Sequence, residues 1–294
     1  MRIGIDLGGT KIEIIAMDET GQVLLQKRVP TPRGDYPATV AAICRLVEKA
    51  EQVLGQQGSL GVGIPGSVSH KTGKIKNANS TWLIGQDLQG DLQTALRREV
   101  RLANDANCFA LSEAVDGAAK GAEVVFGVII GTGCGGGVVV NRQVVNGINA
   151  IGGEWGHNPL PWTRAEDELM ECYCGLKGCN ETFLSGSGVQ AHYQKRTGLS
   201  KTVQQIEALS QQGDAVAEKL MRDYSLWLAK GLASVINLLD PDVIVLGGGM
   251  SNIKRLYSEV PELWGDWVFS DEVSTRLLPP KYGDSSGVRG AAWL

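Results

Sequence analysis

A short sequence pattern occurs twice in this chain, 123 residues apart. Residues 3–8 (IGIDLG) and residues 126–131 (FGVIIG) both read apolar, Gly, apolar, any residue, apolar, Gly. Each copy continues through a Gly/Thr turn, GGTK or GTGCGGG, directly into a second β-rich run, IEIIAM or VVVN. The two copies therefore predict two β-hairpins with Gly-rich tips. A hairpin repeated one domain length apart indicates two similar domains, which we expect to face each other across a cleft.

The rest of the chain alternates between strand and helix patterns. Short runs that are rich in Val and Ile and end in Gly or Pro predict strands at residues 3–8, 60–65, 124–131 and 242–249. Apolar residues at helical spacing predict helices over about 40–54 and 220–239, the second ending at Asp240-Pro241. Strands mixed with helices predict an α/β protein whose helices pack on the faces of its sheets.

The composition limits the class of protein. The chain has 294 residues, 43% of them hydrophobic, so it can bury a sizeable core. Its formal net charge is -4 without a basic block, so nucleic acid and anionic membrane are poor candidates as partners. We find no secretory signal pattern and no apolar run near the roughly 18 residues of a membrane span. We therefore expect a cytoplasmic protein with no membrane or nucleic-acid partner.

The Gly-rich turn at 131–136 matches the dinucleotide fingerprint G-x-G-x-x-G. That fingerprint requires a helix after the turn, whereas Val138, Val139 and Val140 follow here and favour a strand. A nicotinamide-dependent oxidoreductase is therefore disfavoured. The alternative is a hairpin tip whose N–H groups, with the hydroxyl of Thr10 or Thr132, point at phosphate oxygens. Two such tips could hold a polyphosphate from both sides.

Two further features fit nucleotide binding. Asp6 places a carboxylate two residues before the first tip, where Mg²⁺ would need an oxygen ligand or a carboxylate-held water. The alternative is an Asp that only caps the turn. Gly247, Gly248 and Gly249 follow a strand and precede a segment that can be helical, which suits a nucleobase or ribose lying against bare backbone. A plain tight turn is the alternative there.

Three of the six cysteines lie within eight positions, in the stretch CYCGLKGCNE. With His157, the thiols of Cys172, Cys174 and Cys179 supply the four ligands of a closed tetrahedral zinc site. A closed site stabilises a loop and does not activate water. A redox pair or four unrelated residues are the alternatives. The other cysteines, Cys44, Cys108 and Cys134, are interpreted as small buried apolar residues.

Glutamates stand at both ends of the loop that this zinc site would close. Glu154 and Glu181 could accept hydrogen bonds from sugar hydroxyls, because an ionised carboxylate is an acceptor only. Solvated surface glutamates are the alternative. The stretch at 162–171, between His157 and Cys172, is strongly charged, and no predicted ligand lies in it. We therefore expect it to be exposed.

Asp105, in the segment LANDANCF, follows a predicted strand and precedes a predicted helix. A carboxylate at the carboxyl end of a strand is well placed to serve as a catalytic base. Phosphoryl transfer to a sugar needs such an acceptor for the hydroxyl proton, besides alignment and charge neutralisation. The alternative is that Asp105 is the N-cap of the helix.

Six motifs, IGIDLGGTK, NDAN, GTGCGGG, GEWGH, CYCGLKGCNE and DVIVLGGGM, follow one another across nearly the whole chain. In this order they resemble the ROK family (repressors, uncharacterised reading frames, sugar kinases). The resemblance implies an α/β, two-domain, actin-like ATPase (ribonuclease H-like) fold with an interdomain cleft that closes on sugar and ATP, and a structural zinc loop. We expect a small N-terminal domain at 1–118 plus about 282–294, and a large C-terminal domain at 119–281.

The resemblance also implies which residues bind each substrate. The ATP phosphates would contact Gly4, Ile5, Asp6, Leu7, Gly8, Gly9, Thr10 and Lys11 of the first hairpin, and Gly131, Thr132, Gly133, Cys134, Gly135, Gly136, Gly137 and Val138 of the second. The adenosine would lie near Gly247, Gly248 and Gly249. The hexose would be bound by Asn79, Asn104, Asp105, Glu154, His157 and Glu181, with Asp105 as the base. His157 could touch zinc and sugar through its two ring nitrogens.

The resemblance favours an enzyme. ROK repressors carry a helix-turn-helix before the kinase-like part, whereas the first hairpin begins here at residue 3. GIPGSVS, NANSTWL and NDANC are most similar to bacterial fructokinases of the manno(fructo)kinase type. We therefore expect an ATP:hexose 6-phosphotransferase that acts on fructose and mannose and uses ATP, Mg²⁺ and Zn²⁺, with a homodimer as a possible assembly by analogy. An N-acetylglucosamine or glucose kinase of the same family and a sugar-responsive regulator are the alternatives.

Overall fold

The computed structural model describes residues 1–294, which form two compact units. The first unit comprises Met1–Gly121, Gly137–Gly153 and Lys281–Leu294, and the second comprises Ala122–Gly136 and Glu154–Pro280. The sequence-based boundaries differ from this division at 137–153, which they place with the second unit. Residues 137–153 belong to the first unit because they contact it directly. A Cβ on Gly137 would lie 2.6 Å from the carbonyl oxygen of Ala106, and Lys76 Nζ donates to the Asn149 carbonyl at 3.0 Å.

The first unit is built on a five-stranded mixed sheet with the order β3-β2-β1-β4-β7. Strands β1 and β2 pair antiparallel, as do β2 and β3, whereas β1, β4 and β7 are parallel neighbours. The sequence pattern predicts β1, β2, β4 and β7 but not the charged outer strand β3. The bounds are β1 (Arg2–Leu7), β2 (Lys11–Met17), β3 (Val23–Pro30), β4 (Ser59–Ile64) and β7 (Arg101–Asn104).

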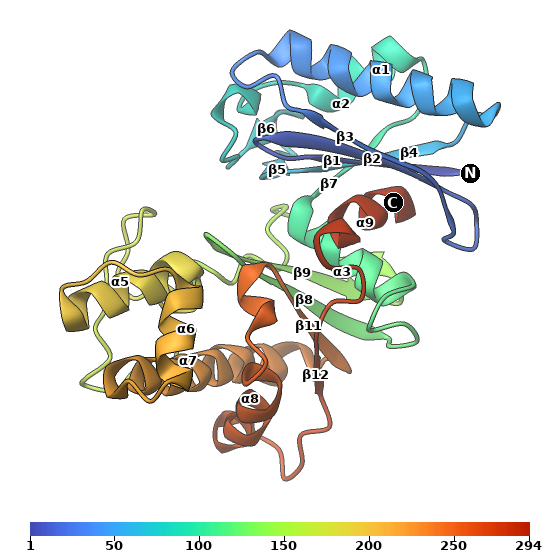
Figure 1. The fold of residues 1–294 in the computed structure, drawn as a ribbon. Coiled ribbons are helices and arrows are strands. Elements are labelled where there is room, and N and C mark those ends of the chain that lie inside the picture. The colour runs from blue at the N-terminus through green and yellow to red at the C-terminus, as the bar shows by residue number, and fades with distance from the viewer. The chain divides into compact units, whose positions relative to one another are not determined.

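Helices cover both faces of this sheet (Figure 1). On one face α1 (Tyr36–Leu54) packs its buried stripe, including Ile43 and Val47, against a core that contains Ile12 and Ile14 of β2. The Asp35 side chain caps the start of α1 by accepting from Ala38 N, and Gly55 ends the helix in the left-handed conformation. The remaining elements of this unit are α2 (Leu88–Leu96), α3 (Asp105–Val115), α9 (Ser286–Trp293), the short strands β5 (Ser67–Val68) and β6 (Ile75–Lys76), and the 3-10 turns η1 (Thr81–Leu83) and η4 (Gly283–Ser285).

The C-terminal helix α9 lies against the opposite face of the first sheet, at backbone contact distance. A Cβ on Gly4 of β1 would lie 2.1 Å from the carbonyl oxygen of Val288, and one on Gly61 of β4 would lie 1.9 Å from that of Ala291. On α9 itself, a Cβ on Gly290 would lie 1.6 Å from the carbonyl oxygen of Cys108 in α3. Glycine is therefore required at these positions by close packing between backbones.

The second sheet repeats the topology of the first. Its order is β10-β9-β8-β11-β12, so each strand has the same place in the chain order as its counterpart in the first sheet. β9 begins at Cys134, which confirms the predicted second hairpin and leaves no helix after the fingerprint turn. The bounds are β8 (Val124–Ile130), β9 (Cys134–Val140), β10 (Gln143–Val144), β11 (Val243–Gly247) and β12 (Arg276–Leu278).

The long helix α7 forms the centre of the second unit's helical layer. Its apolar stripe, which includes Trp227 and Leu228, is fully buried, and the Asp214 side chain caps its start. The helix pattern predicted over 220–239 therefore belongs to a longer helix. The bounds are α4 (Asn180–Leu184), α5 (Gly186–Thr197), α6 (Val203–Gln211), α7 (Ala215–Leu239) and α8 (Leu256–Trp264), with 3-10 turns η2 (Gly249–Asn252) and η3 (Gly265–Trp267).

The charged stretch at 162–171 is not simply an exposed excursion, and that expectation is wrong at Asp167. This carboxylate is only 5% exposed, accepts from the indole nitrogen of Trp227 at 2.9 Å and pairs with Arg164 at 2.8 Å. Arg164 also pairs with Asp223 of α7 at 3.0 Å. The charges therefore attach this stretch to α7, and only part of it faces solvent.

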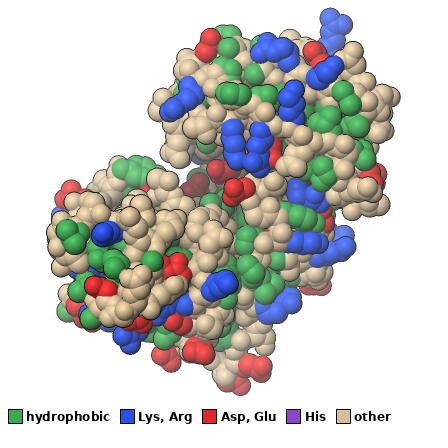
Figure 2. All heavy atoms as spheres, in the orientation of Figure 1, with side chains coloured by type: hydrophobic (Ala, Val, Ile, Leu, Met, Phe, Trp, Pro, Cys, Tyr) green, Lys and Arg blue, Asp and Glu red, His purple; other side chains and the backbone are tan.

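No helix in the structure combines the length and apolarity that crossing a bilayer would need. On the face drawn in Figure 2, Lys and Arg side chains lie in several separate groups, with Asp and Glu side chains between some of them. This distribution fits the spread of charge along the sequence.

Candidate active site and metal centre

The first Gly-rich tip, Gly8 to Thr10, connects β1 to β2 in the first unit. Gly8 N donates to the Lys11 carbonyl at 2.9 Å, which closes the turn and leaves Gly9 and Thr10 exposed. Thr31, just beyond β3, holds the tip from the side: its N–H donates to the Thr10 carbonyl at 3.0 Å and its hydroxyl to the Gly8 carbonyl at 2.8 Å. The tip therefore presents bare backbone on a fixed support, as phosphate binding requires.

Asp6 lies at the carboxyl end of β1, immediately before this tip. Burial, followed by the negative charges of Asp105 and Glu13, raises the pKa of Asp6 to about 6. Asp6 and Asp105 lie at the same edge of the sheet, because strands β1 and β7 both run parallel to β4. Two carboxylates at one strand edge are a group that attracts a cation.

Asp105 is the first residue of α3 and not its N-cap. The cap is Asn104, whose side-chain oxygen accepts from Ala106 N at 2.9 Å. Its amide group donates to the Gly66 carbonyl at 2.9 Å, which ties the β7–α3 corner to the segment after β4. Asp105 also accepts from Ala106 N, at 2.8 Å, and its side chain is exposed. The alternative of Asp105 as N-cap is wrong, because the preceding Asn occupies that position.

The predicted sugar residue Asn79 lies on an exposed loop of the first unit, just before η1. Its neighbour Ser80 is buried, and its hydroxyl lies 3.4 Å from where a Cβ on Gly9 would be. The loop that carries Asn79 is therefore next to the first tip. Within the first unit, the structure brings together the loop of Asn79, the tip and the pair Asp6 and Asp105.

The second Gly-rich tip, Gly131 to Gly133, connects β8 to β9 and is held by the start of α5. Gly186 N donates to the Gly131 carbonyl at 2.8 Å, and the Ser187 hydroxyl donates to the Thr132 carbonyl at 2.6 Å. Glu181 of α4 accepts from Cys134 N at 2.9 Å. These contacts fix the tip on three sides and leave the Thr132 side chain exposed.

The glycines after β11 form a strained turn. Gly248 has a φ of +77°, and a Cβ there would lie 2.4 Å from the Ile130 carbonyl, so only glycine fits. The following segment is a 3-10 turn, and the α-helix begins only at Leu256. The predicted helix therefore does follow the glycines, but only after the 3-10 turn η2. Gly248 and Gly249 are exposed and offer backbone to a ligand.

The four predicted metal ligands form one cluster. The ligand atoms of His157, Cys172, Cys174 and Cys179 all lie within 4.8 Å of one another. Cys172 Sγ is 3.5 Å from His157 Nδ1, and Cys174 Sγ is 3.6 Å from Cys179 Sγ. A tetrahedron with zinc–sulfur bonds of about 2.3 Å has edges of about 3.7 Å, so these separations fit zinc. Gly175 and Gly178, both with positive φ, make the tight turn between the ligands.

Two antiparallel segments carry the ligands to this cluster. Leu160 N donates to the Gly178 carbonyl at 2.8 Å, and Asn180 N donates to the Asn158 carbonyl at 2.7 Å. Glu181 N then donates to the Gly156 carbonyl at 2.8 Å. Because Glu181 follows Cys179 by two residues and also binds the second tip, the cluster and the tip share one support.

Tyr173 lies in the sequence between Cys172 and Cys174, and its side chain contacts His157. Its hydroxyl is 2.9 Å from His157 Nε2, and the two rings meet edge to face at 5.1 Å. The Nε2 position that a sugar would use is therefore paired with Tyr173 in this structure. Tyr173 also lines a cavity of about 200 Å³ together with Glu181 and Ser187. Burial, and then the Glu181 carboxylate, raise the pKa of Tyr173.

Glu154 is exposed, and its backbone position is fixed by its neighbour Trp155. Trp155 is buried, donates from its indole nitrogen to the Gly135 carbonyl at 3.1 Å, and packs edge to face on Phe126. Glu154 also raises the pKa of Tyr173, after burial, Glu181 and Cys172, so both glutamates lie near that phenol. The structure therefore brings Glu154, Glu181 and the cysteine cluster together in the second unit.

Sequence reasoning missed three residues that build these sites: Thr31, Tyr173 and Ser187. Thr31 lies outside any motif, so no local signal marks it. Ser187 belongs to SGSG at the start of α5, a helix-start pattern in which the Ser185 side chain caps Gly188 N. Tyr173 lies inside the cysteine motif but is not itself a zinc ligand.

Comparison with known proteins shows which family the chain resembles over its whole length. The sequence profile of the ROK family matches residues 2–294. An N-acetyl-D-glucosamine kinase of Yersinia pseudotuberculosis is 41% identical over 299 residues, covering all of this chain and 98% of the relative. An N-acetyl-D-glucosamine kinase of Salmonella typhimurium is 40% identical, covering all of this chain and 99% of the relative.

Solved structures share the fold. A ROK hexokinase from Thermus thermophilus is 32% identical, with a TM-score of 0.89 over 99% of this chain and 96% of that chain. A ROK glucokinase from Streptomyces griseus, solved with glucose and AMPPNP, is 28% identical, with a TM-score of 0.75 over 99% of this chain and 97% of that chain. These similarities confirm the predicted actin-like, α/β fold.

The expectation of a fructokinase is wrong. The full-length relatives at 40–41% identity are named N-acetyl-D-glucosamine kinases, and none of these is named a fructokinase. The fructokinase prediction rested on the short motifs GIPGSVS, NANSTWL and NDANC. The choice among hexoses depends on one or two hydroxyl contacts, which such short motifs do not specify. From the match over residues 2–294 and the full-length relatives, the chain belongs to the ROK family.

Proposed function

We propose that this protein is an ATP-dependent kinase that phosphorylates N-acetyl-D-glucosamine on its 6-hydroxyl. The main observation in support is the identity of 40–41%, over the whole chain, to relatives with that name. The intact Asp105, Gly-rich tips and Cys₃His cluster also favour a catalytically complete enzyme. A sugar-responsive regulator needs none of the acceptor chemistry that Asp105 offers.

For the nucleotide, we assign the backbone of the two tips to the triphosphate and Gly247 to Gly249 to the adenosine. The exposed N–H groups at Gly9 and Thr10 and at Thr132 suit phosphate oxygens. Asp6 suits Mg²⁺, directly or through water, because its acid group sits beside Asp105 at the sheet edge. Bound Mg²⁺ would neutralise charge on the phosphates.

For the sugar, we assign Asn79, Asn104 and Asp105 of the first unit and Glu154, His157 and Glu181 of the second. In the proposed reaction Asp105 accepts the proton of the primary hydroxyl as its oxygen attacks the γ-phosphorus and ADP leaves. The glutamates would accept hydrogen bonds from ring hydroxyls. His157 Nε2 would bind the sugar only if the Tyr173 hydroxyl moved away from this nitrogen or bridged it to the sugar.

For the metal, we assign zinc to His157, Cys172, Cys174 and Cys179. The separations between their ligand atoms fit a tetrahedral ion, and all four coordination positions are taken by protein. Bound zinc would stabilise the turn and supply no chemistry to the reaction. Through Glu181, the same turn supports the second tip.

A substrate panel tests the proposed function. Purified protein is assayed with ATP and Mg²⁺ on N-acetylglucosamine, N-acetylmannosamine, glucose, mannose and fructose, with release of ADP coupled to NADH oxidation. We expect kcat/KM to be highest for N-acetylglucosamine by at least about tenfold, which corresponds to about 1.4 kcal/mol in the transition state. A higher kcat/KM for any other sugar of the panel would contradict the proposal, and ADP release without sugar serves as the blank.

A further inference from the structure

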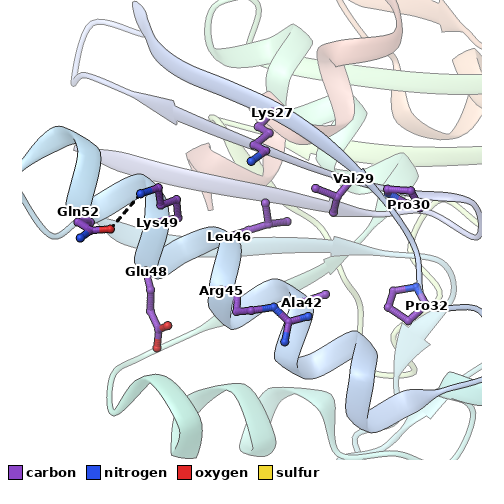
Figure 3. Close-up of a pocket in the computed structure, with 10 residues that line it drawn as sticks. All are labelled: Lys27, Val29, Pro30, Pro32, Ala42, Arg45, Leu46, Glu48, Lys49 and Gln52. Carbon is purple, nitrogen blue, oxygen red and sulfur yellow. Dashed lines mark hydrogen bonds between the residues drawn. The ribbon is translucent and has the colours of Figure 1, made fainter.

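A groove of about 730 Å³ lies between β3 and α1 of the first unit, and none of its lining residues is assigned to substrate or metal above (Figure 3). It exists because β3 is the edge strand of its sheet. The register pairs Ile12 with Val29 and Ile14 with Lys27, so Lys27 and Val29 face the same side as the core under α1. The helix covers the middle of the sheet and leaves this side of the outer strand open.

Three cations line the groove: Lys27 from β3, and Arg45 and Lys49 from α1. All three are exposed, and none forms an ion pair with a carboxylate within 4.0 Å. Arg45 and Lys49 are four residues apart on the helix, an arrangement in which like charges repel each other. The one acid of the lining, Glu48, points away from Lys27 on the far side of α1 (Figure 3). Within the lining, Lys49 donates to the neutral side chain of Gln52 at 3.2 Å, so the groove keeps a net positive charge.

The floor between these cations is apolar. It consists of Ala42 and Leu46, which are buried in α1, and of Val29, Pro30 and Pro32 on the strand side. A cationic rim over an apolar floor suits a small molecule with an anionic group and an organic body. Among anions, a phosphate monoester fits best, because Arg can bind it through two parallel hydrogen bonds while lysines add point charges. The volume lies within the range of about 300–1,000 Å³ that is typical of small-molecule sites.

We propose that this groove binds a phosphorylated small molecule, with the phosphate on Lys27, Arg45 and Lys49 and the organic part on the apolar floor. The position has a consequence for the first tip. Pro30 and Pro32 flank Thr31, whose N–H and hydroxyl hold the carbonyls of Thr10 and Gly8. A ligand seated against both prolines therefore contacts the support of the phosphate-binding tip, on the side away from Asp6.

The test is calorimetric titration of the full chain with N-acetylglucosamine 6-phosphate, AMP and inorganic phosphate, in parallel on the wild type and on Lys27→Gln/Arg45→Gln. Binding at any other site is common to both proteins, so the difference isolates the groove. We expect a saturable site for at least one ester in the wild type, with a Kd raised about tenfold or more in the double variant. Lys120→Gln, which removes an exposed charge outside the groove, should leave that Kd unchanged.

The result of this binding test does not depend on whether the proposed kinase function is correct. Since Lys27 and Arg45 lie outside the assigned machinery, the double variant should phosphorylate its sugar at the wild-type rate in the absence of added ester. Equal Kd values in wild type and double variant would overturn the proposal whatever the sugar specificity. Binding of inorganic phosphate alone, or an equal loss in Lys120→Gln, would overturn it as well, because the first excludes a role for the floor and the second indicates nonspecific charge attraction.

Discussion

At the residue scale, Asp105 carries the chemistry of the proposed reaction. Asp105→Asn keeps the size of the side chain and a hydrogen-bonding group but removes the acceptor for the hydroxyl proton. We expect kcat to fall by about 10²–10⁴-fold, which is the usual contribution of a positioned base, while sugar affinity changes little. The measurements are steady-state kinetics and sugar titration by calorimetry. Retention of kcat within about threefold of wild type would remove Asp105 from this role.

His192 predicts a pH dependence of stability. Its ring is 3% exposed between Phe183 and Trp227, and burial, followed by the charge of Arg196, lowers the pKa of His192 to about 4. The unfolded chain therefore binds this proton first as pH falls below about 6.5, so the free energy of unfolding decreases from pH 6.5 toward 4. The facing carboxylates Glu168 and Asp167 oppose the shift only in part.

The variant His192→Phe keeps a ring in this stack and cannot take up a proton. Urea unfolding at pH 8 and pH 5 should show that the wild type loses about 2 kcal/mol more than the variant over this range. A common loss in both proteins would come from other groups and cancels in the comparison. An equal pH dependence of wild type and variant would mean that His192 does not titrate as its burial implies.

The role of a residue could be predicted from the sequence only where its type and spacing allow few functions. Three cysteines and a histidine at short spacing have few explanations, and their ligand atoms do cluster. Asn104 and Asp105 were harder, because both residue types cap helices, and the structure gives the cap to Asn104. The role of Glu181 as acceptor for Cys134 N was not predictable, since it joins positions 47 residues apart with no periodic pattern.

At the scale of elements, the cysteine turn and the second tip are joined through Glu181. Cys174→Ala, or removal of zinc by a chelator, should release the turn that carries Glu181 and weaken sugar binding. We expect KM for the sugar to rise more than KM for ATP, because Gly186 and Ser187 still hold the tip. Metal content by mass spectrometry, with both KM values, checks this. An equal rise of both would indicate that zinc stabilises the whole unit.

The matched control for this prediction is Cys44→Ala, which removes a thiol from α1 in the first unit. It should leave the zinc content and both KM values unchanged, because Cys44 lies outside the cluster. The comparison separates loss of a ligand from loss of any cysteine.

Element prediction succeeded where a pattern was strong. β1, β4, β8 and β11 are apolar runs bounded by glycine or proline, and most of their residues are buried. β3 was missed because its residues LLQKRV are mostly exposed at a sheet edge, where charge protects against unwanted pairing. The stretch at 162–171 was misjudged because charge suggested exposure, whereas Asp167 is buried by its bonds to Arg164 and Trp227.

At the scale of the whole molecule, the repeat identified from sequence determines the architecture. Two sheets with one topology follow from two hairpins with one pattern, and the order of neighbours is the same in both. Substrate choice was not predictable at this scale. We assign the motifs shared with the family to phosphate, metal and base, whereas the choice among hexoses depends on one or two hydroxyl or acetamide contacts.

The packing of α9 gives a prediction for the integrity of the first unit. Gly290→Ala would place a Cβ 1.6 Å from the Cys108 carbonyl, a contact that requires the backbone of α9 or α3 to move. We expect a loss of about 3 kcal/mol or more in the free energy of unfolding, or failure to fold. The control is Gly265→Ala, which has negative φ and nothing within 4 Å, and should change stability by less than about 1 kcal/mol. Chemical unfolding of both variants decides the matter, and equal stability would refute the packing.

The placement of α9 also bears on how the protein is made. The first unit begins at Met1 but needs Ser286–Trp293 against β1 and β4, and the C-terminal carbonyl of Leu294 accepts from Arg101. Since a nascent chain emerges from the ribosome N-terminus first, this unit cannot complete its core until α9 has been made. The second unit, contained within residues 122–280, can close earlier, so the first-made strands are the last to become native.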